Sequence, residues 1–243
     1  YIGETDEGLN GSSSRKDLET MFQLIYMDFM QPRADKQLFG VMTSQMKSLL
    51  ANQAATPEYE FEVTLQNALS QNHFRARPLT PALVDEMNLD KSLAFYKDRF
   101  ADASDFTFVF IGSFTTDVMK PLVERYLGSL PATRRRETWK DNGPHPPKNA
   151  IIEKKVEKGL EPKSQAAIVF TGAFEWSPAN RVAIRAMGDV LENRLREALR
   201  EELGGTYSVS VSPGYTKVPA PEYTLQIDFG CAPDRTDALV KRM

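Results

Sequence analysis

The sequence is poor in the residues that form covalent cross-links and metal sites. Its 243 residues include one cysteine and two histidines. The single cysteine, Cys231, excludes an internal disulfide and is expected to be a small buried hydrophobic residue. His73 and His145 each lack a second histidine or a carboxylate at the spacing of a metal-ligand motif. We therefore expect both histidines to be ordinary surface residues, and we expect no metal site in the chain.

Long apolar runs and a strong excess of one charge are missing as well. No apolar run approaches the roughly 20 residues of a membrane-spanning helix, so no membrane span is expected. The net charge of −3 and the pI near 5.6 give no electrostatic reason to bind nucleic acid or an anionic membrane. With 41% apolar and 26% charged residues, the composition is typical of a globular protein.

Several segments begin like helices, with a side chain that can cap the first turn. The predicted caps are Ser14, Asp35, Thr56 and Thr80, and a proline follows each of the last two. Apolar residues then recur at helical spacing. The predicted inward stripes of the first two helices are Leu18, Phe22, Ile25 and Phe29, and Leu38, Met42, Met46 and Leu49.

Strands are predicted where apolar residues run on or alternate with polar ones. The predicted strands cover residues 1–6, 106–111, 151–156, 165–171 and 223–229, of which 106–111 reads as fully buried. A faint repeat relates residues 106–123 to residues 223–240, because in both a strand, a glycine and a polar turn precede a helix. This repeat favours an α+β protein built from duplicated αβ domains.

Residues 131–147 interrupt these patterns with four prolines, three consecutive arginines and no apolar period. Such a composition predicts an exposed linker that trypsin would cut first at Arg134, Arg135 or Arg136. The predicted organisation is one αβ domain over residues 1–130, a linker over 131–149, and the first part of a second, homologous domain over 150–243. Both ends of the sequence read as interrupted elements, so we expect the chain to be part of a longer polypeptide.

The segment 177–211 organises the rest of the chain as a long helix followed directly by a strand. Ser177 can cap the helix, and Gly204 and Gly205 can end it in the left-handed conformation. Tyr207 then begins an alternation that is typical of a half-buried strand. The predicted apolar face of the helix comprises Ala183, Met187, Val190, Leu191, Arg194, Leu195 and Ala198. The pattern therefore places Arg200 and Tyr207 at one helix–strand corner.

Residues 199–209, Leu-Arg-Glu-Glu-Leu-Gly-Gly-Thr-Tyr-Ser-Val, resemble the C-terminal half of the pitrilysin/insulinase family of zinc metallopeptidases. Residues 24–33, which end in Gln-Pro-Arg, and residues 108–114, which contain Gly-Ser-Phe, resemble further parts of the same family. The resemblance implies an α+β fold of two duplicated αβ domains, with antiparallel-rich sheets and helices packed on one face. It also implies that the chain covers most of a third domain, the linker and the beginning of a fourth.

This resemblance also implies roles for individual residues. Arg200 and Tyr207 match the arginine and tyrosine that contact substrate near the scissile bond in the family. The family binds Zn²⁺ through an inverted His-x-x-Glu-His motif, which this chain lacks. We therefore expect no catalytic residue and no metal ligand in this chain, and we expect zinc to be bound by an N-terminal half outside it.

The same two residues also have a purely structural interpretation. Arg200 can be one charge on a solvated helix end, within reach of Glu197, in the way that Arg196 would pair with Glu192. Tyr207 can be a half-buried aromatic residue at a strand start. Spacing alone favours this interpretation, whereas the family resemblance favours substrate binding.

Two functions from different classes remain open at this point. The first is the substrate-binding C-terminal half of a zinc metalloendopeptidase, inactive alone, whose partners are a peptide substrate and the N-terminal half of the same protein. The second is a non-catalytic peptide-binding or assembly subunit related to the core proteins of processing peptidases. The resemblance points to a periplasmic or otherwise exported bacterial protein, with a cytoplasmic location as the alternative.

Overall fold

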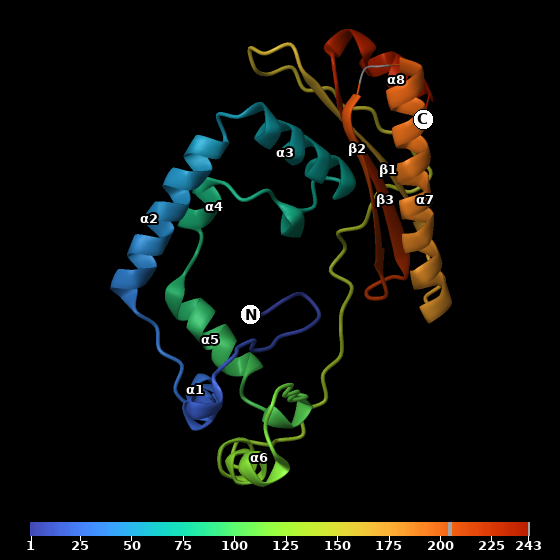
Figure 1. The fold of residues 1–243 in the computed structure, drawn as a ribbon. Coiled ribbons are helices and arrows are strands. Elements are labelled where there is room, and N and C mark those ends of the chain that lie inside the picture. The colour runs from blue at the N-terminus through green and yellow to red at the C-terminus, as the bar shows by residue number, and fades with distance from the viewer. Residues whose placement is uncertain (204–205, 243) are drawn as a thin grey trace. The chain divides into compact units, whose positions relative to one another are not determined.

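The computed structural model is a mixed α+β structure, as predicted (Figure 1). It describes the backbone of residues 1–203 and 206–242, and the side chains of these residues except those from 200 to 207. The helices are α1 (Leu18–Met30), α2 (Lys36–Gln53), α3 (Pro57–Leu69), α4 (Pro81–Asp85), α5 (Leu89–Arg99), α6 (Thr116–Leu122), α7 (Pro178–Leu203) and α8 (Thr236–Arg242). The strands are β1 (Ser164–Ala173), β2 (Thr206–Thr216) and β3 (Glu222–Cys231).

The chain forms two compact units, each assembled from two separate stretches of sequence. Unit 1 consists of Tyr1–Ala51 and Leu79–Thr138, and unit 2 of Asn52–Pro78 and Trp139–Met243. Helix α3 therefore belongs with the C-terminal sheet rather than with the helices that flank it in sequence. The proposed division into two homologous domains with a linker at 131–149 stays a prediction. Within the described residues, no helix combines the length and hydropathy that a membrane span requires.

The predicted helix starts are confirmed by their capping hydrogen bonds. Ser14, Asp35, Thr56 and Thr80 each accept a backbone N–H two or three residues ahead, at 2.9 to 3.2 Å. These bonds satisfy N–H groups that the first turn of a helix leaves without an intrahelical partner. Ser14 caps a short 3₁₀ turn that leads into α1, so it acts one turn earlier than the α-helix itself.

Aromatic side chains from α1, α5 and an extended segment build the core of unit 1. Phe22 and Phe29 of α1 are 0% and 8% exposed, so the predicted stripe of α1 is confirmed. Phe29 packs edge-on against Phe100 and Phe106, with ring centroids 5.2 and 5.0 Å apart. Offset and edge-on packing of this kind adds to the free energy gained by burying the rings.

The prediction of a buried strand at 106–111 is wrong. The segment is extended, but it pairs with no strand among the described residues. Phe110 packs against Phe22 at 5.1 Å, whereas Val109 and Ile111 are 72% and 95% exposed. Alternate residues of an extended segment face opposite sides, and α1 covers one side only. The apolar run therefore reflects one packed face rather than burial on both.

The predicted inward face of α2 is also wrong. Leu38, Met42 and Leu49 are between 53% and 57% exposed, while Leu50 is buried. The predicted helix is confirmed, whereas the prediction of which side of it is buried is wrong. An apolar stripe shows that a helix is amphipathic and does not show what covers it.

Asp102 fastens the beginning of the predicted linker to unit 1. The side chain is 1% exposed and accepts five hydrogen bonds: from the N–H and hydroxyl groups of Ser104 and Thr133, and from the N–H of Arg135. The Arg135 guanidinium also pairs with Glu137 at 2.5 Å. The prediction of an exposed linker is therefore wrong at Arg135, whose side chain is 28% exposed and whose backbone N–H is bound to the buried Asp102.

The sheet of unit 2 is antiparallel, with β3 between β1 and β2. The predicted strands at 165–171 and 223–229 and the strand that follows the long helix are confirmed, and each is longer than predicted. Two other predicted strands are absent from the described structure. Residues 1–6 contribute only an isolated bridge from Ile2 to Glu7, and residues 151–156 form no strand, with Ile151 94% exposed.

Helix α7 begins as predicted, because the Ser177 hydroxyl accepts the N–H of Asn180 at 3.0 Å. The face that packs differs from the predicted one. Met187, Val190 and Arg194 are exposed. The residues that face the sheet and its core are Ile184, Gly188, Leu191, Leu195 and Leu199. The predicted apolar face of α7 is displaced by about one residue from the face that packs. Gly188 has no apolar side chain that would mark its side of the helix in the sequence, although this side lies closest to β2.

Gly188 sits where α7 lies directly on β2. A Cβ atom at this position would come within 2.9 Å of Cγ of Pro213. The proline ring is tied to the strand backbone and cannot swing away. Gly40 of α2 is a matched helical glycine with no atom near its hypothetical Cβ.

We predict opposite effects of alanine at these two glycines. Gly40→Ala should raise the free energy of unfolding by up to about 1 kcal/mol, because alanine is the better helix former. Gly188→Ala should lower it by roughly 1–3 kcal/mol, because overpacking outweighs this gain. Urea unfolding of the two variants beside the parent protein measures both shifts. Equal, stabilising shifts would contradict the close contact of α7 with β2.

Asp102 should make stability depend on pH. Its hydrogen bonds with Ser104 and Thr133 hold the pKa of Asp102 well below the ordinary range. A depressed pKa contributes stability above the ordinary value of about 3.9, and this contribution is lost as the pH falls through the folded-state pKa. Asp102→Asn should therefore lower the melting temperature at neutral pH. The difference in melting temperature between this variant and the parent protein should become smaller in strong acid.

Asp105→Asn is the control for this measurement. Asp105 is exposed, three residues further on, and burial by its surroundings raises its pKa instead of lowering it. Neutralising Asp105 should leave the melting temperature at neutral pH unchanged or slightly raised. An equal loss of stability in both variants would show that the network around Asp102 is not specific.

Candidate functional site at the α7–β2 corner

The two predicted site residues lie on the backbone of one corner. Arg200 belongs to the last turn of α7, which ends at Leu203, and Tyr207 is the second residue of β2, which begins at Thr206. The side chains of Arg200 and Tyr207 lie outside the described residues, as do Gly204 and Gly205. The structure thus bears out the helix and the strand but gives no side-chain geometry for the pair.

Tyr207 occupies an irregular position in the strand. Thr206 is opposite Cys231 and Ser208 is opposite Gly230, so Tyr207 is an extra residue in β2. A β-bulge of this kind leaves one residue outside the regular backbone pairing of the two strands. Sequence alternation alone could not reveal the bulge, because it assumes a regular strand.

Buried residues on both sides fix this corner in place. Leu199, directly before Arg200, is 0% exposed and joins a core with Val209, Cys231 and Leu239. Cys231 is 1% exposed, which confirms that it is a buried hydrophobic residue. Apolar packing therefore anchors the helix and the strand on either side of the corner.

A carboxylate of α7 also binds the edge of the sheet. The Glu192 carboxylate accepts the N–H of Val211 at 3.1 Å, a group that an edge strand would otherwise leave unpaired. The same carboxylate pairs with Arg196, as the sequence predicted. This contact fixes the rotation of α7 about two helical turns before Arg200.

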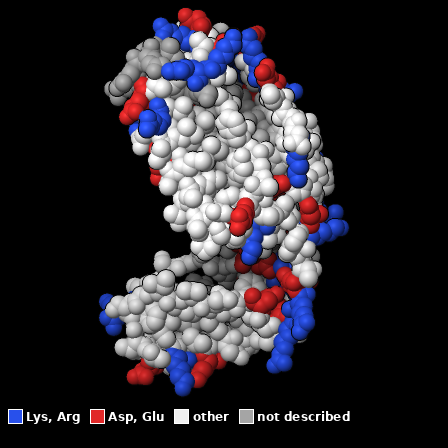
Figure 2. Space-filling model, turned by 90° about the vertical axis from the view of Figure 1, so that its right-hand side faces the viewer, with Lys and Arg blue, Asp and Glu red and all other residues white. Residues whose placement is uncertain are grey.

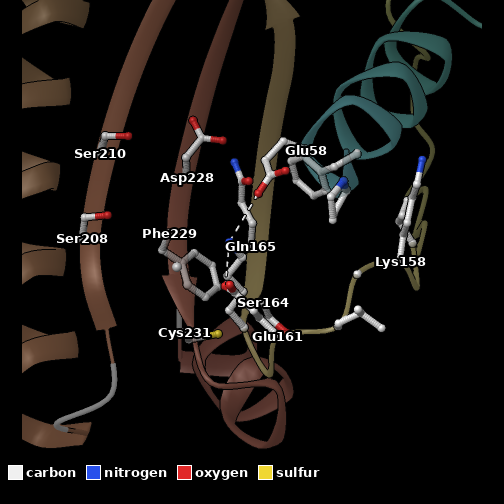
Figure 3. A pocket seen from close by; sticks show the side chains of 17 residues that line it. Glu58, Lys158, Glu161, Ser164, Gln165, Ser208, Ser210, Asp228, Phe229 and Cys231 are labelled. Atoms are coloured by element: carbon white, nitrogen blue, oxygen red, sulfur yellow. Dashed lines mark ion pairs between the residues drawn. The ribbon is translucent and has the colours of Figure 1, made fainter. Parts of the chain in front are cut away.

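The sheet has one apolar and one polar face, and the polar face begins next to Tyr207. Val209, Val211 and Ile227 point into the core. Ser208 and Ser210 project to the other side of β2 (Figure 3). The two faces follow from the alternation of side chains along a strand.

A cavity of about 960 Å³ lies over this polar face. Ser208, Ser210, Gln165 and Asp228 line it from the sheet (Figure 3). Its other walls include Pro57 and Phe61 of α3 and Val156, Leu160 and Glu161 of the segment before β1. The sequence showed the row of serines but could not show that α3 would help to enclose them.

The cations of this cavity already have partners. Lys163 pairs with Glu58 at 3.6 Å and with Glu161 at 3.2 Å. Lys158 donates a hydrogen bond to the carbonyl of Ala54 at 2.7 Å. Three carboxylates and two ammonium groups line the cavity, so its lining carries one net negative charge.

His145 is not the ordinary surface residue that the sequence predicted. Its Nε2 lies 2.9 Å from Asp141 Oδ2, and its Nδ1 lies 3.5 Å from Glu222 Oε2. The backbone carbonyl of His145 accepts a hydrogen bond from Gln71 at 3.1 Å. The hydrogen bond with Asp141 raises the pKa of His145, and the nearby charge of Glu222 adds to the shift. In the sequence, the four-residue separation of Asp141 and His145 is the feature that could have predicted this contact.

The described residues do not fit a zinc site. They contain no group of three or more His, Cys, Asp or Glu side chains placed to hold a metal ion. His145 has two carboxylate neighbours, but they do not complete such a group. On the face shown in Figure 2, basic side chains gather along the upper edge, and elsewhere basic and acidic side chains lie next to one another around a large uncharged surface. Nothing on that face resembles a nucleic-acid-binding surface.

Comparisons with known proteins agree with this architecture. The family described as the peptidase M16 inactive domain matches residues 86–243. A probable zinc protease PqqL from Haemophilus influenzae is 26% identical over 243 residues, which cover 98% of this chain and 25% of that protein. The chain thus spans about a quarter of the length of this relative.

Two solved structures share the fold. The periplasmic protease PqqL from Escherichia coli superposes with a TM-score of 0.79 at 22% identity, over 93% of this chain and 25% of that one. A peptidase M16 inactive domain from Pseudomonas fluorescens superposes with a TM-score of 0.64 at 17% identity, over 94% of this chain and 55% of that one. At these identities the structures establish the fold alone.

The contact between His145 and Asp141 can be tested by titration. Asp141→Asn should lower the pKa of His145 toward its ordinary value, because the charged acceptor is lost. A raised histidine pKa contributes stability below the ordinary value of about 6.5 and loses it as the pH rises through the folded-state pKa. NMR titration of His145 measures the shift, with Glu153→Gln as the control. An unchanged pKa in Asp141→Asn would show that the pair does not form.

Proposed function

This chain belongs to the family of the peptidase M16 inactive domain, and from that membership we propose that it is the zinc-free, substrate-binding part of a zinc metallopeptidase. The bound substrate is a peptide, and Arg200 and Tyr207 contact it near the scissile bond. Arg200 holds and polarises the peptide through charge-assisted hydrogen bonds, and Tyr207 donates from its phenol. Neither residue is a metal ligand.

One observation carries the proposal. Arg200 lies in the last turn of the long helix α7, which packs on the sheet, and Tyr207 lies at a bulge in β2, the strand that follows. This helix–strand order is the one in which the pitrilysin/insulinase family presents its substrate-contacting arginine and tyrosine. The buried Leu199 and the close contact at Gly188 hold the helix that carries Arg200 against the sheet.

The metal belongs to another part of the protein in this proposal. The relative from Haemophilus influenzae is named a probable zinc protease, and this chain covers only a quarter of it. Zn²⁺ would then be held by an N-terminal half with a His-x-x-Glu-His motif, where it supplies an activated water. The periplasmic location of the E. coli PqqL protease supports an exported location for this protein.

A non-catalytic binding or assembly role is the alternative, and the preceding part of the reading frame separates the two. An intact His-x-x-Glu-His motif with stoichiometric zinc in the full-length protein supports the peptidase. Its absence supports a subunit that binds without cleaving. The arginine and tyrosine favour the peptidase, because a purely structural subunit has no use for them.

Substitutions in the full-length protein test the proposed roles. A charge-assisted hydrogen bond is worth roughly 1.5–3 kcal/mol and a neutral one about 1 kcal/mol. Arg200→Ala should therefore lower kcat/KM roughly ten- to hundredfold and Tyr207→Phe by less. The double variant should lose less than the product of the two, because neighbours that serve one substrate group are coupled.

Arg196→Ala is the matched control, since this exposed arginine lies one turn earlier on α7 and pairs with Glu192. It should leave kcat/KM unchanged. Steady-state cleavage of one peptide by all variants gives the comparison, and melting temperatures show whether each variant is folded. A folded Arg200/Tyr207 double variant with unchanged kcat/KM would refute the proposed substrate contact.

A further inference from the structure

We propose that the cavity on the polar face of the sheet is a subsite for a lysine or arginine side chain of the bound peptide, with Asp228 as its counterion. This inference rests on the proposed function and adds a preference among peptide substrates. Three features of unit 2 support it: a carboxylate without an ion pair among the described residues, apolar side chains in the lining, and the short distance along β2 to Tyr207.

Asp228 is the carboxylate of the cavity without a cation. Glu58 and Glu161 are both paired with Lys163. Asp228 accepts hydrogen bonds from the Gln226 amide at 2.9 and 3.0 Å and has no ion pair among the described residues. The Gln226 amide is a neutral donor, and no positive charge in the described part of the chain pairs with the half-buried Asp228.

The neighbours of Asp228 suit a cationic group with several N–H donors. Ser210 is directly opposite Asp228 on β2, and Ser208 lies two residues before it on the same face. The hydroxyl oxygens of both serines can accept hydrogen bonds from an ammonium or guanidinium group. On the other side of Asp228, the sheet partner is Ala167, which leaves room for the ligand.

The remaining walls suit the aliphatic stem of such a side chain. Phe61 and Pro57 of α3 line the cavity together with Val156, while Leu160 is fully exposed at its rim. Lysine and arginine bury their methylene stems along apolar surface while the charged head finds polar partners. An acidic side chain would meet Asp228 with a like charge, and a purely apolar one would leave it desolvated and unpaired.

A bare metal ion fits this cavity less well. The acidic side chains do not form a group that could hold a metal, and two of the three carboxylates are engaged by Lys163. The occupant is therefore an organic cation on an apolar stem.

The cavity begins one residue beyond the proposed substrate-binding corner along β2. Ser208 directly follows Tyr207 in β2 and lines the cavity. Ser210, opposite Asp228, lies three residues beyond Tyr207, which corresponds to roughly 10 Å of strand. A peptide held at Tyr207 can therefore place a side chain two or three residues from the scissile bond into the cavity.

Peptide pairs that differ only in charge test the inference in the full-length protein. Each pair carries arginine or its neutral isostere citrulline at the same position, and the position is moved along the peptide. At one position, the parent protein should cleave the arginine peptide with a kcat/KM roughly tenfold higher, as expected for one charge-assisted hydrogen bond. In Asp228→Asn, which keeps the shape and one acceptor oxygen, this ratio should fall to about 1.

Asp234→Asn is the control, because Asp234 is an exposed aspartate of the same unit that does not line the cavity. It should preserve the arginine preference. An unchanged arginine-to-citrulline ratio in a folded, active Asp228→Asn variant would overturn the subsite and leave the proposed function intact.

If the parent protein cleaves neither peptide, the proposed peptidase function is refuted. Peptide binding, measured without cleavage, then tests the subsite independently. Fluorescence anisotropy of the two labelled peptides with the zinc-chelated protein gives their dissociation constants. Tighter binding of the arginine peptide that is lost in Asp228→Asn supports the subsite. Equal binding, or binding of free arginine or a polyamine but of neither peptide, refutes it.

Discussion

Helix α7 can lie directly on strand β2 only because Gly188 has no side chain. Pro213 fills the space that a Cβ would need, so helix and strand approach as closely as their backbones allow. From this contact, α7 runs on to the buried Leu199 and reverses into β2 beside Cys231. This packing positions the helix and the strand on either side of the Arg200–Tyr207 corner.

The two faces of the sheet in unit 2 differ in what they contribute: one face is part of the core, and the other lines a cavity. One side of β2 and β3 buries Val209, Ile227 and Phe229 in the core. The other side presents Ser210 and Asp228 to a cavity. Because side chains alternate strictly along a strand, substitutions on the polar side can change ligand preference without opening the core. A binding surface can therefore vary while the fold that carries it stays the same.

Local signals in the sequence predicted more of this structure than long-range ones did. Caps such as Ser177 and the alternation in β2 act within a few residues, and both were confirmed. The inward face of α2, the strand at 106–111 and the surroundings of His145 were predicted wrongly. Each depends on which distant segment packs against it, and apolar periodicity carries no information about that partner. The cavity beside Asp228 was not predicted for the same reason, since residues of α3, which are distant in sequence, form part of its lining.

The central claim is that the α7–β2 corner touches the bound peptide, and photo-crosslinking tests it most directly. Benzoylphenylalanine in place of Tyr207 in the full-length, zinc-chelated protein should crosslink to a labelled peptide, and excess unlabelled peptide should suppress the product. The same group in place of Val182, an exposed residue roughly 30 Å away at the start of α7, should not crosslink. Equal labelling at both positions, or labelling at Val182 alone, would contradict the account.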